Sequence, residues 1–266
     1  MVEMEQKDKF MLQSEVMTQT KLTEDICSLT LKATEIAKAA VPGQFVVLYC
    51  KEGSRMLPRP ISICEVNRAK GTVRLVYRIV GAGTREFSTL EPGDTVEVMG
   101  PLGNGYQMDI AEPLLMGGGI GIPPMLFLAK ELSAKGITKK HLQVILGYRD
   151  TPFLADEFKK IATVYITSDS GAVGRKGNVV DCAREMNVMG DTIFACGPTP
   201  MLRAVKRYAY ENDLPAQISL EEHMACGIGA CLACVTRTVE PDEHFKVNTR
   251  RVCKDGPVFL AEEVEL

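Results

Sequence analysis

The sequence is poor in several features that would place the chain in a specialised class of protein. Its net charge of −3 argues against a dedicated nucleic-acid binder. No apolar run approaches the ~18–20 residues that a membrane-spanning helix needs, and residues 1–9 lack the apolar core of a signal peptide. Tryptophan is absent, which excludes no class. The 266 residues, 45% of them hydrophobic, therefore predict a soluble globular protein of two or three small domains.

Histidine is also scarce, with three in the chain and none at the spacing of metal ligands, whereas cysteine is abundant, with nine. Four cysteines follow the pattern C-x4-C-x2-C, then eighteen intervening residues and a single cysteine: Cys226, Cys231, Cys234 and Cys253. This spacing is typical of plant-type [2Fe–2S] loops, in which four thiolates hold two irons. The glycines inside the loop allow the positive φ angles that a chain wrapped around a cluster needs.

Two other interpretations of these four cysteines are weaker. A structural zinc site usually combines two pairs of ligands, and here only one C-x2-C pair exists. Disulfides would need a secreted protein, which nothing in the sequence indicates. The other five cysteines are scattered singly and are expected to be reduced, mostly buried thiols of a cytoplasmic protein: Cys27, Cys50, Cys64, Cys182 and Cys196.

Residues 10–99 consist of short β-rich runs that are broken by turn residues. The clearest runs are 45–50, 72–80 and 95–99, where β-branched and apolar residues dominate. An alanine-rich segment at 32–40 is compatible with a short helix, and we interpret it as a connection before Pro42-Gly43. Several short strands separated by Gly and Pro turns predict a small antiparallel β-barrel.

Two segments of this region contain residue types that bind anions. In Arg59-Pro60-Ile61-Ser62, the arginine can hold a phosphate group bidentately and the serine adds a hydroxyl group. In Gly81-Ala-Gly-Thr84, the glycines let the backbone approach a ligand closely, and the threonine can begin a helix. Taken alone, the first segment also fits an ordinary surface cation, and the second fits a turn with a helix cap.

After residue 105 the pattern changes to alternating strands and helices. A short apolar strand at 113–116 runs into Gly117–Gly121 and then into a helix with proline in its first turn. A strand, a glycine turn and a helix N-terminus together form an anion site. Further strands are expected at 142–147, 164–167 and 192–196. This alternation predicts a doubly wound, parallel α/β sheet, although the glycine run lacks the third glycine of a Rossmann fingerprint.

In this order, the two anion-binding segments resemble the flavin domain of the ferredoxin–NADP reductase superfamily. The resemblance implies that Arg59 binds the pyrophosphate of FAD and that Ser62 lies beside the flavin ring. It assigns FAD contacts to further residues on the same strands and turn: Pro60, Ile61, Val76, Tyr77, Arg78, Gly83 and Thr84. Many members carry an aromatic residue directly before the serine. Ile61 stands there in this chain, which argues against aromatic packing on the flavin at that position.

The glycine run and the later Cys-Gly-Pro segment resemble the nicotinamide domain of the same superfamily. The resemblance implies a dinucleotide site that is shaped by six residues: Gly119, Gly121, Pro123, Cys196, Gly197 and Pro198. Cys196 would be the catalytic residue that faces the nicotinamide, and a plain buried thiol is the alternative. The choice between NAD and NADP stays open, because Asp150, Asp169 and Arg149 offer both a ribose acceptor and a phosphate partner.

The expected architecture is α+β and has three parts. An antiparallel, FAD-binding β-barrel covers residues 1–108, a doubly wound NAD-binding α/β domain covers 109–213, and a small [2Fe–2S] domain covers 214–266. The last part is too short to be a complete ferredoxin and is expected to dock on the rest. The order of the three parts and the sequences around Cys226 and Cys253 resemble the electron-transfer subunits of type B dihydroorotate dehydrogenases.

That resemblance implies a role in pyrimidine biosynthesis together with a partner. A catalytic subunit containing FMN would oxidise dihydroorotate, and two copies of each subunit would form a heterotetramer. Electrons would pass singly through the [2Fe–2S] cluster to FAD, and a hydride would pass from FAD to NAD+ as the acceptor. The alternatives are an NAD(P)H-dependent reductase subunit of a ferredoxin oxidoreductase or hydrogenase complex, and a zinc-containing, non-redox nucleotide-binding module.

Overall fold

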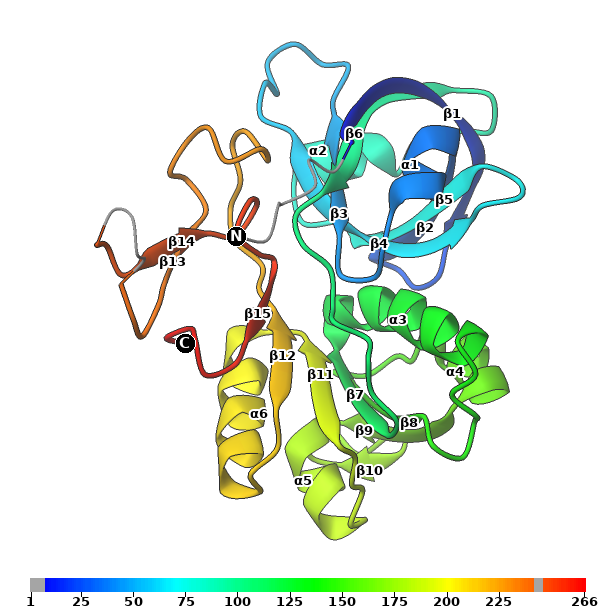
Figure 1. Cartoon of the computed structure of the whole chain (residues 1–266). Coiled ribbons are helices and arrows are strands. Elements are labelled where there is room, and N and C mark those ends of the chain that lie inside the picture. Colours follow the sequence, from blue (N-terminus) through cyan, green and yellow to red (C-terminus); the bar gives the residue numbers. More distant parts are fainter. Residues whose placement is uncertain (1–7, 242–245) are drawn as a thin grey trace.

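A computed structural model describes residues 8–241 and 246–266, and its N-terminal part is a closed antiparallel barrel (Figure 1). The strand order around the barrel is β1-β2-β5-β4-β3-β6. Its strands are β1 (Phe10–Lys21), β2 (Ile26–Lys32), β3 (Phe45–Tyr49), β4 (Arg59–Asn67), β5 (Thr72–Arg78) and β6 (Thr95–Leu102). Two short helices, α1 (Thr34–Ala39) and α2 (Ala82–Phe87), lie in the connections. The predicted barrel is confirmed, and the alanine-rich connection at 32–40 contains helix α1.

The two faces of β5 show how the barrel is built. Val73, Leu75 and Tyr77 pack in the apolar cluster inside the barrel. Val76 points to the opposite face and packs with residues of the α/β domain. Because side chains alternate along a strand, one strand thus serves both the barrel core and the contact between the domains.

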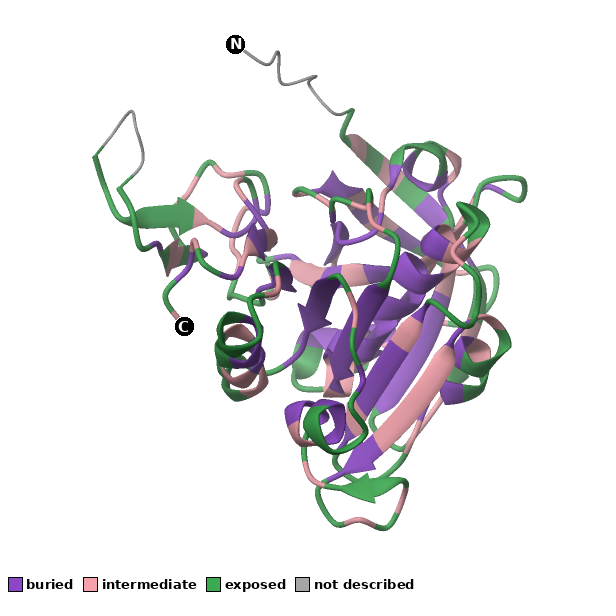
Figure 2. Cartoon of the chain, turned by 60° about the horizontal axis from the view of Figure 1, so that its bottom comes forward, coloured by how far each residue is buried: buried purple, intermediate pink, exposed green. Residues whose placement is uncertain are grey.

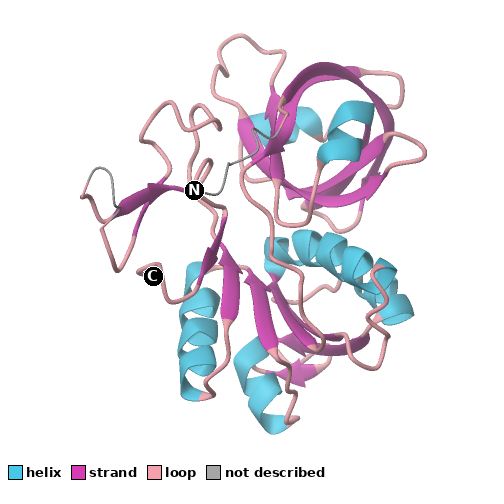
Figure 3. Ribbon diagram, in the orientation of Figure 1, coloured by secondary structure: helices cyan, strands magenta, loops and turns pink. Residues whose placement is uncertain are grey.

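The second part is a seven-stranded sheet of order β10-β9-β8-β7-β11-β12-β15 (Figure 3). Its strands are β7 (Pro113–Gly118), β8 (Gln143–Tyr148), β9 (Thr163–Ser168), β10 (Arg175–Lys176), β11 (Thr192–Cys196), β12 (Ala216–Ser219) and β15 (Val258–Leu260). All neighbours pair in parallel except β12 and β15. The helices are α3 (Ile122–Ala134), α4 (Ala155–Ile161), α5 (Val179–Glu185) and α6 (Thr199–Glu211), with the 3₁₀ turn η1 (Gly119–Gly121) before α3.

Helices cover both faces of this sheet, as the doubly wound prediction requires. Leu114 and Met116 of β7 pack on the side of α5 and α6. Leu115, between them, packs on the side of α3 and α4. A strand that is buried on both faces is continuously apolar, which explains the run Pro113-Leu-Leu-Met116.

The C-terminal part is attached to both other parts. Its β15 extends the sheet by pairing antiparallel with β12, so residues on both sides of position 214 share one sheet. The Asn104 N–H donates to the carbonyl group of Gly256, which ties this part to the end of β6. A ribbon of β13 (Val235–Arg237) and β14 (Thr249–Arg251) projects outwards and is largely exposed (Figure 2).

Helix α3 lies between the barrel and the sheet (Figure 1). Its Phe127 is fully buried and joins the apolar cluster of the barrel, whereas its Met125 and Leu126 pack against the sheet side. The helix thus belongs to both cores and fixes the glycine turn before it relative to the barrel. Within residues 8–241 and 246–266, no helix combines the length and apolar character that crossing a membrane requires.

Candidate functional site

A cleft of about 580 Å³ lies where the three parts of the molecule meet. Seven of the predicted FAD contacts line it: Pro60, Ile61, Ser62, Val76, Tyr77, Arg78 and Thr84. Phe45 on β3, whose partner in the sheet is Ser62, forms the adjoining wall. A cleft of this size, apolar on its strands and with a few polar groups, is typical of cofactor sites.

The ring of Tyr77 does not point into this cleft. It packs inside the barrel edge-on to Phe87, with 6.4 Å between the ring centres. Its hydroxyl group accepts a hydrogen bond of 2.9 Å from Gln19 Nε2, and burial raises its pKa well above 10. Tyr77 therefore shapes the wall through its position in β5, and its ring is not available to stack on a ligand.

Arg59 and Gly83 do not line the cleft themselves, but each precedes a residue that does, Pro60 and Thr84, and the two lie against each other. A Cβ on residue 83 would overlap the Arg59 guanidinium, so this approach requires glycine. The Arg59 Nη1 donates to the backbone carbonyl groups of Arg55, at 3.3 Å, and Leu57. A guanidinium has five N–H donors, so others remain for a phosphate group. The contact between Arg59 and Gly83 fits the pyrophosphate site that the resemblance implies.

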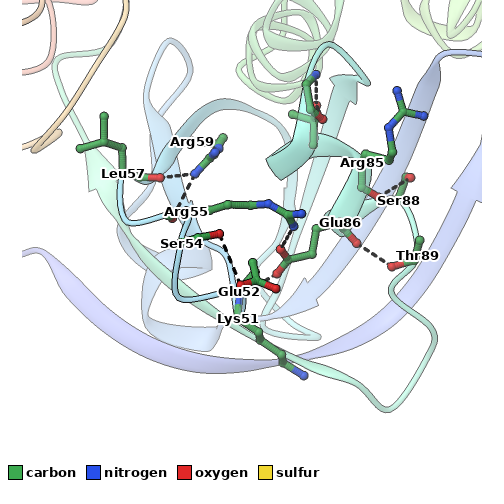
Figure 4. A network of polar contacts seen from close by, with 12 residues as sticks. Lys51, Glu52, Ser54, Arg55, Leu57, Arg59, Arg85, Glu86, Ser88 and Thr89 are labelled. Carbon is green, nitrogen blue, oxygen red and sulfur yellow. Dashed lines mark hydrogen bonds and ion pairs between the residues drawn. The ribbon is translucent and has the colours of Figure 1, made fainter.

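Thr84 holds the turn next to this arginine. Its Oγ1 accepts hydrogen bonds from the N–H groups of Val80, at 2.9 Å, and Gly81, at 3.1 Å. The loop on the other side is tied down by an ion pair between Arg55 and Glu86, and Glu86 also accepts from the Lys51 N–H at 2.6 Å (Figure 4). The turn and the loop thus form a fixed frame around Arg59.

The segment from Leu220 to Met224 also lines the cleft, and the sequence analysis missed it. Water reaches the Glu221 side chain from the cleft, but protein atoms surround it closely. This burial raises the pKa of Glu221 above its usual 4.5, and Arg78 acts in the opposite direction. The position of this segment could have indicated its role, because it lies directly between β12 and the first cysteine of the cluster pattern.

The two glycine loops of the predicted dinucleotide site are in direct contact. The Gly119–Gly121 turn follows β7, and Gly197 and Pro198 follow the neighbouring strand β11. A Cβ on Gly121 would overlap the carbonyl group of Cys196. Gly119 has a φ of 54°, which glycine adopts at little cost. Pro123 is buried in the first turn of α3.

Cys196 itself is fully buried at the carboxyl end of β11. Burial raises the pKa of its thiol far above the usual value, and the nearby Glu221 adds to this effect. Within the described part of the chain it lines neither the main cleft nor two smaller clefts of about 340 and 210 Å³. Gly197 and Pro198 line the first of these smaller clefts, and Gly119 lines the second with Arg149 and Asp150.

The four predicted cluster ligands form two pairs. Cys226 Sγ lies 3.3 Å from Cys231 Sγ, and the Cys231 N–H points at Cys226 Sγ over 3.4 Å. The Cys253 N–H points at Cys234 Sγ over 3.5 Å. Burial raises the pKa of Cys226, but N–H groups of Cys231, Ile228 and Ala230 outweigh it and lower the value from 9.0 to about 6. These backbone donors favour a thiolate.

Two pairs of thiolates suit two irons, each of which takes two sulfides and two cysteines. In the described residues, no group of three or more His, Cys, Asp or Glu side chains is placed to hold a single metal ion. A structural zinc ion would need all four cysteines around one point. Gly227 and Gly229 have φ angles of 69° and 82°, as a loop around a cluster requires. The donor set therefore fits a [2Fe–2S] cluster.

Comparison with known families agrees with this geometry. Residues 13–106 match the oxidoreductase FAD-binding domain, and residues 221–265 match the iron-sulfur cluster binding domain of dihydroorotate dehydrogenase B. Together with the fold and the two sites, these matches define an oxidoreductase subunit that uses FAD and an iron–sulfur cluster. The predicted class and these two cofactors are thus confirmed.

Relatives over the full chain narrow the class to one family. The dihydroorotate dehydrogenase B (NAD(+)), electron transfer subunit of Listeria monocytogenes is 41% identical, covering 96% of this chain and 100% of its own. The Fusobacterium nucleatum subunit of the same name is 40% identical, covering 92% and 95%. The chain belongs to the family of dihydroorotate dehydrogenase B electron transfer subunits, which confirms the resemblance found in the sequence.

Solved structures extend the comparison. A chain of the NADH-dependent reduced ferredoxin-NADP oxidoreductase superposes with a TM-score of 0.84 at 32% identity, covering 96% of this chain and 90% of that one. A ferredoxin reductase of carbazole 1,9a-dioxygenase has a TM-score of 0.66 at 20% identity, covering 77% and 67%. The second comparison shows the fold alone.

Proposed function

We propose that the chain carries electrons from a dihydroorotate-oxidising subunit to NAD+. One observation carries the proposal: a single short segment joins the flavin cleft to the iron–sulfur ligands. Met224 lines the cleft, and Cys226 is two residues further along the chain. Two residues span at most ~7 Å, so a cofactor in the cleft and a cluster on Cys226 lie close enough to exchange electrons.

The residues around the cleft have distinct tasks in this scheme. Bound FAD supplies a centre that exchanges single electrons with an iron–sulfur cluster and a hydride with nicotinamide. Arg59 binds its pyrophosphate, and Gly83 leaves the space that this arginine needs. Val76 supplies an apolar side chain to the cleft, whereas Ile61 packs in the barrel cluster and lines the cleft through its position in β4. Ser62 and Arg78 supply polar groups that would contact the flavin. The cluster is held by Cys226, Cys231, Cys234 and Cys253.

The dinucleotide binds on the other side of the cleft. Gly119, Gly121 and Gly197 add no side chains at three positions of the two loops, and Pro123 and Pro198 shape the turns beside them. Ile120 and Thr199, one from each loop, line the main cleft, which supports a nicotinamide site at this part of the cleft. We assign Cys196 to the packing that supports this contact. Its complete burial favours a positioning role for the thiol over direct contact with the ring.

The partner in this proposal is a catalytic subunit that contains FMN, in a heterotetramer of two copies of each chain. The relatives' name, electron transfer subunit, supports a division of labour in which another chain binds the pyrimidine. We place the complex in the cytoplasm, where the thiols of this cysteine-rich chain stay reduced. Its barrel, sheet and cluster loop then serve only the transfer of electrons.

A second candidate function is a reductase subunit that exchanges electrons between NAD(P)H and ferredoxin. The similarity to the NADH-dependent reduced ferredoxin-NADP oxidoreductase supports it, because that match also covers nearly the whole chain. The two candidates differ in the partner that co-purifies with the chain, which is an FMN-containing subunit in one case and an iron–sulfur protein in the other.

The experiment is to isolate the complex without oxygen and to add dihydroorotate and NAD+. The proposal expects orotate and NADH to form together, and it expects neither when the chain is left out. A complex that reduces ferredoxin but forms no orotate would establish the second candidate instead. A colourless protein holding one zinc ion would contradict both.

A further inference from the structure

A ring of four charged side chains joins the barrel to the α/β domain. Glu65 on β4 and Arg74 on β5 come from the barrel, and Lys130 on α3 and Glu157 on α4 come from the other domain. Arg74 Nη1 lies 2.9 Å from Glu157 Oε1 and 3.4 Å from Glu65 Oε2. Lys130 Nζ lies 2.7 Å from Glu65 Oε1 and 3.1 Å from Glu157 Oε2. Each cation contacts both anions, so the ring is closed.

The ring is shielded from water on its inner side. The exposed fraction of its side chains lies between 20% and 32%. Beneath it, Cys64 is completely buried, and this burial raises the pKa of its thiol to about 12. Burial opposes the charge on Glu157, but hydrogen bonds from Arg74 and Lys130 outweigh it and lower the pKa of this carboxyl. Charges in such a place are screened less than exposed ones.

Apolar contacts also hold the two domains together. The interface already buries apolar side chains, with Phe127 of α3 in the barrel cluster and Ile26 and Val76 of the barrel in the domain cluster. Apolar burial is non-directional and does not by itself fix the orientation of the two domains. Four short ion contacts between four different elements, in contrast, are satisfied together in one orientation of the domains. Networks of this kind can contribute orientation even where they contribute little net stability.

The elements that carry the ring also carry the candidate site. On β4, Ser62 lines the cleft three residues before Glu65, and on β5, Val76 lines it two residues after Arg74. On the other side, α3 begins directly after the Gly119–Gly121 turn. The ring therefore links the strands of the flavin cleft to the helix that follows the nicotinamide turn.

An unusual backbone angle precedes α4, the helix that carries Glu157 of the ring. Leu154, which precedes the helix, has a φ of 62°, an uncommon angle for a residue with a branched side chain. The helix that follows brings Glu157, in its first turn, to both Arg74 and Lys130. A strained residue that persists next to such a contact suggests that the direction of α4 matters to the protein.

We infer that the charge ring of Glu65, Arg74, Lys130 and Glu157 is a positioning device that holds the nicotinamide turn at a fixed place over the flavin cleft. The inference rests on the proposed function, since it takes the cleft as the FAD site and the glycine turn as the nicotinamide site. On this account the ring acts through orientation, and none of its members touches a cofactor.

The test compares Glu157→Gln, which keeps the size of the side chain but removes its charge, with the control Glu185→Gln. Glu185 pairs with Arg175 inside the α/β domain and is 52% exposed. We expect NADH to reduce the flavin of Glu157→Gln between about tenfold and 10²-fold more slowly, the cost of a misplacement near 1 Å. The rate at which dithionite reduces the flavin should be unchanged. The flavin content of the protein should also be unchanged. Amide hydrogen exchange should become faster in α3 and β4, and the control should match the wild type throughout.

A second pair of variants keeps the test valid if Glu157→Gln folds poorly. Lys130→Arg retains the charge and should retain the NADH rate, whereas Lys130→Met should lose it. Wild-type rates and exchange in Glu157→Gln and Lys130→Met would overturn the inference and leave the proposed function intact. If NADH does not reduce the flavin of the wild-type chain, the proposed function itself is overturned, and the inference with it.

Discussion

Gly121 lies so close to Cys196 that a Cβ on Gly121 would overlap the carbonyl group of the cysteine. The contact joins the turn after β7 to the loop after β11, and those strands are neighbours in the sheet. The two loops approach the cleft together, through Ile120 on one side and Thr199 on the other. The proposed nicotinamide site would thus depend on a contact that only glycine allows.

Gly121→Ala is therefore expected to separate the two loops. Overpacking of a close contact costs ~1–3 kcal/mol, and we expect a loss of stability of that size in urea unfolding. The rate at which NADH reduces the flavin should fall more than the flavin content. Gly53→Ala is the matched control, because a Cβ there meets no atom within 4 Å. An unchanged NADH rate in Gly121→Ala would show that the loop contact is not needed.

Cys231→Ser should remove the iron–sulfur cluster. Cys231 shares its pair with Cys226, and a hydroxyl group is a poor substitute for a thiolate on iron. We expect iron content and the visible absorption of the cluster to fall to background while FAD remains bound. Cys182→Ser, a buried thiol on α5 far along the chain from the pattern, should keep both. Wild-type iron content in Cys231→Ser would refute the ligand assignment.

Arg59→Ala should weaken the binding of FAD. A charge-assisted hydrogen bond contributes ~1.5–3 kcal/mol, which corresponds to about 10- to 100-fold in affinity. Arg59→Lys should restore only part of it, because a lysine cannot hold a phosphate bidentately. Flavin fluorescence during titration of the FAD-free chain measures the effect. Arg207→Ala, on the exposed side of α6, is the control; equal affinities in Arg59→Ala and Arg207→Ala would exclude a pyrophosphate contact.

Glu221 gives a prediction for the dependence of stability on pH. Because burial raises its pKa in the folded chain above the usual 4.5, the folded state binds the proton more tightly than the unfolded state. Its contribution to stability is therefore greatest below pH 4.5 and is lost as the pH rises through the folded-state pKa. Glu221→Gln should lose less stability than the wild type over this rise, as measured by urea unfolding at several pH values.

Glu222→Gln, one residue further on, serves as the control for this comparison and should follow the wild-type curve. The opposite slope, with Glu221→Gln losing more stability than the wild type as the pH rises, would mean that Glu221 is held as a carboxylate by a partner. Binding of FAD in the cleft should enlarge the difference, since it removes the water that now reaches Glu221.

Features that depend on local spacing could be predicted from the sequence. The C-x4-C-x2-C pattern predicted the iron–sulfur domain that the family match at residues 221–265 confirms, because three of the four proposed ligands belong to one tight loop. The barrel followed from its short strands, and the doubly wound sheet followed from apolar strands that alternate with helices. Val76 and Ser62 could be assigned to the flavin cleft through the resemblance, because each lies in a recognisable strand.

Features that depend on distant pairs could not be predicted in this way. Arg74 and Glu157 are 83 positions apart, and no local pattern marks them as partners. The return of β15 to the sheet beside β12 accompanies the docking of the cluster loop on the barrel, where Gly227 lies next to Val47 and Leu102. The complete burial of the Cys196 side chain likewise results from packing across the sheet.

The most direct measurement is to mix the purified chain with NADH in the absence of oxygen and to follow flavin absorption and the electron paramagnetic resonance of the cluster together. The account predicts that the flavin band bleaches first and that the signal of a reduced [2Fe–2S] cluster follows. A flavin that bleaches while the cluster stays oxidised would contradict the claim that the segment from Met224 to Cys226 connects the two centres.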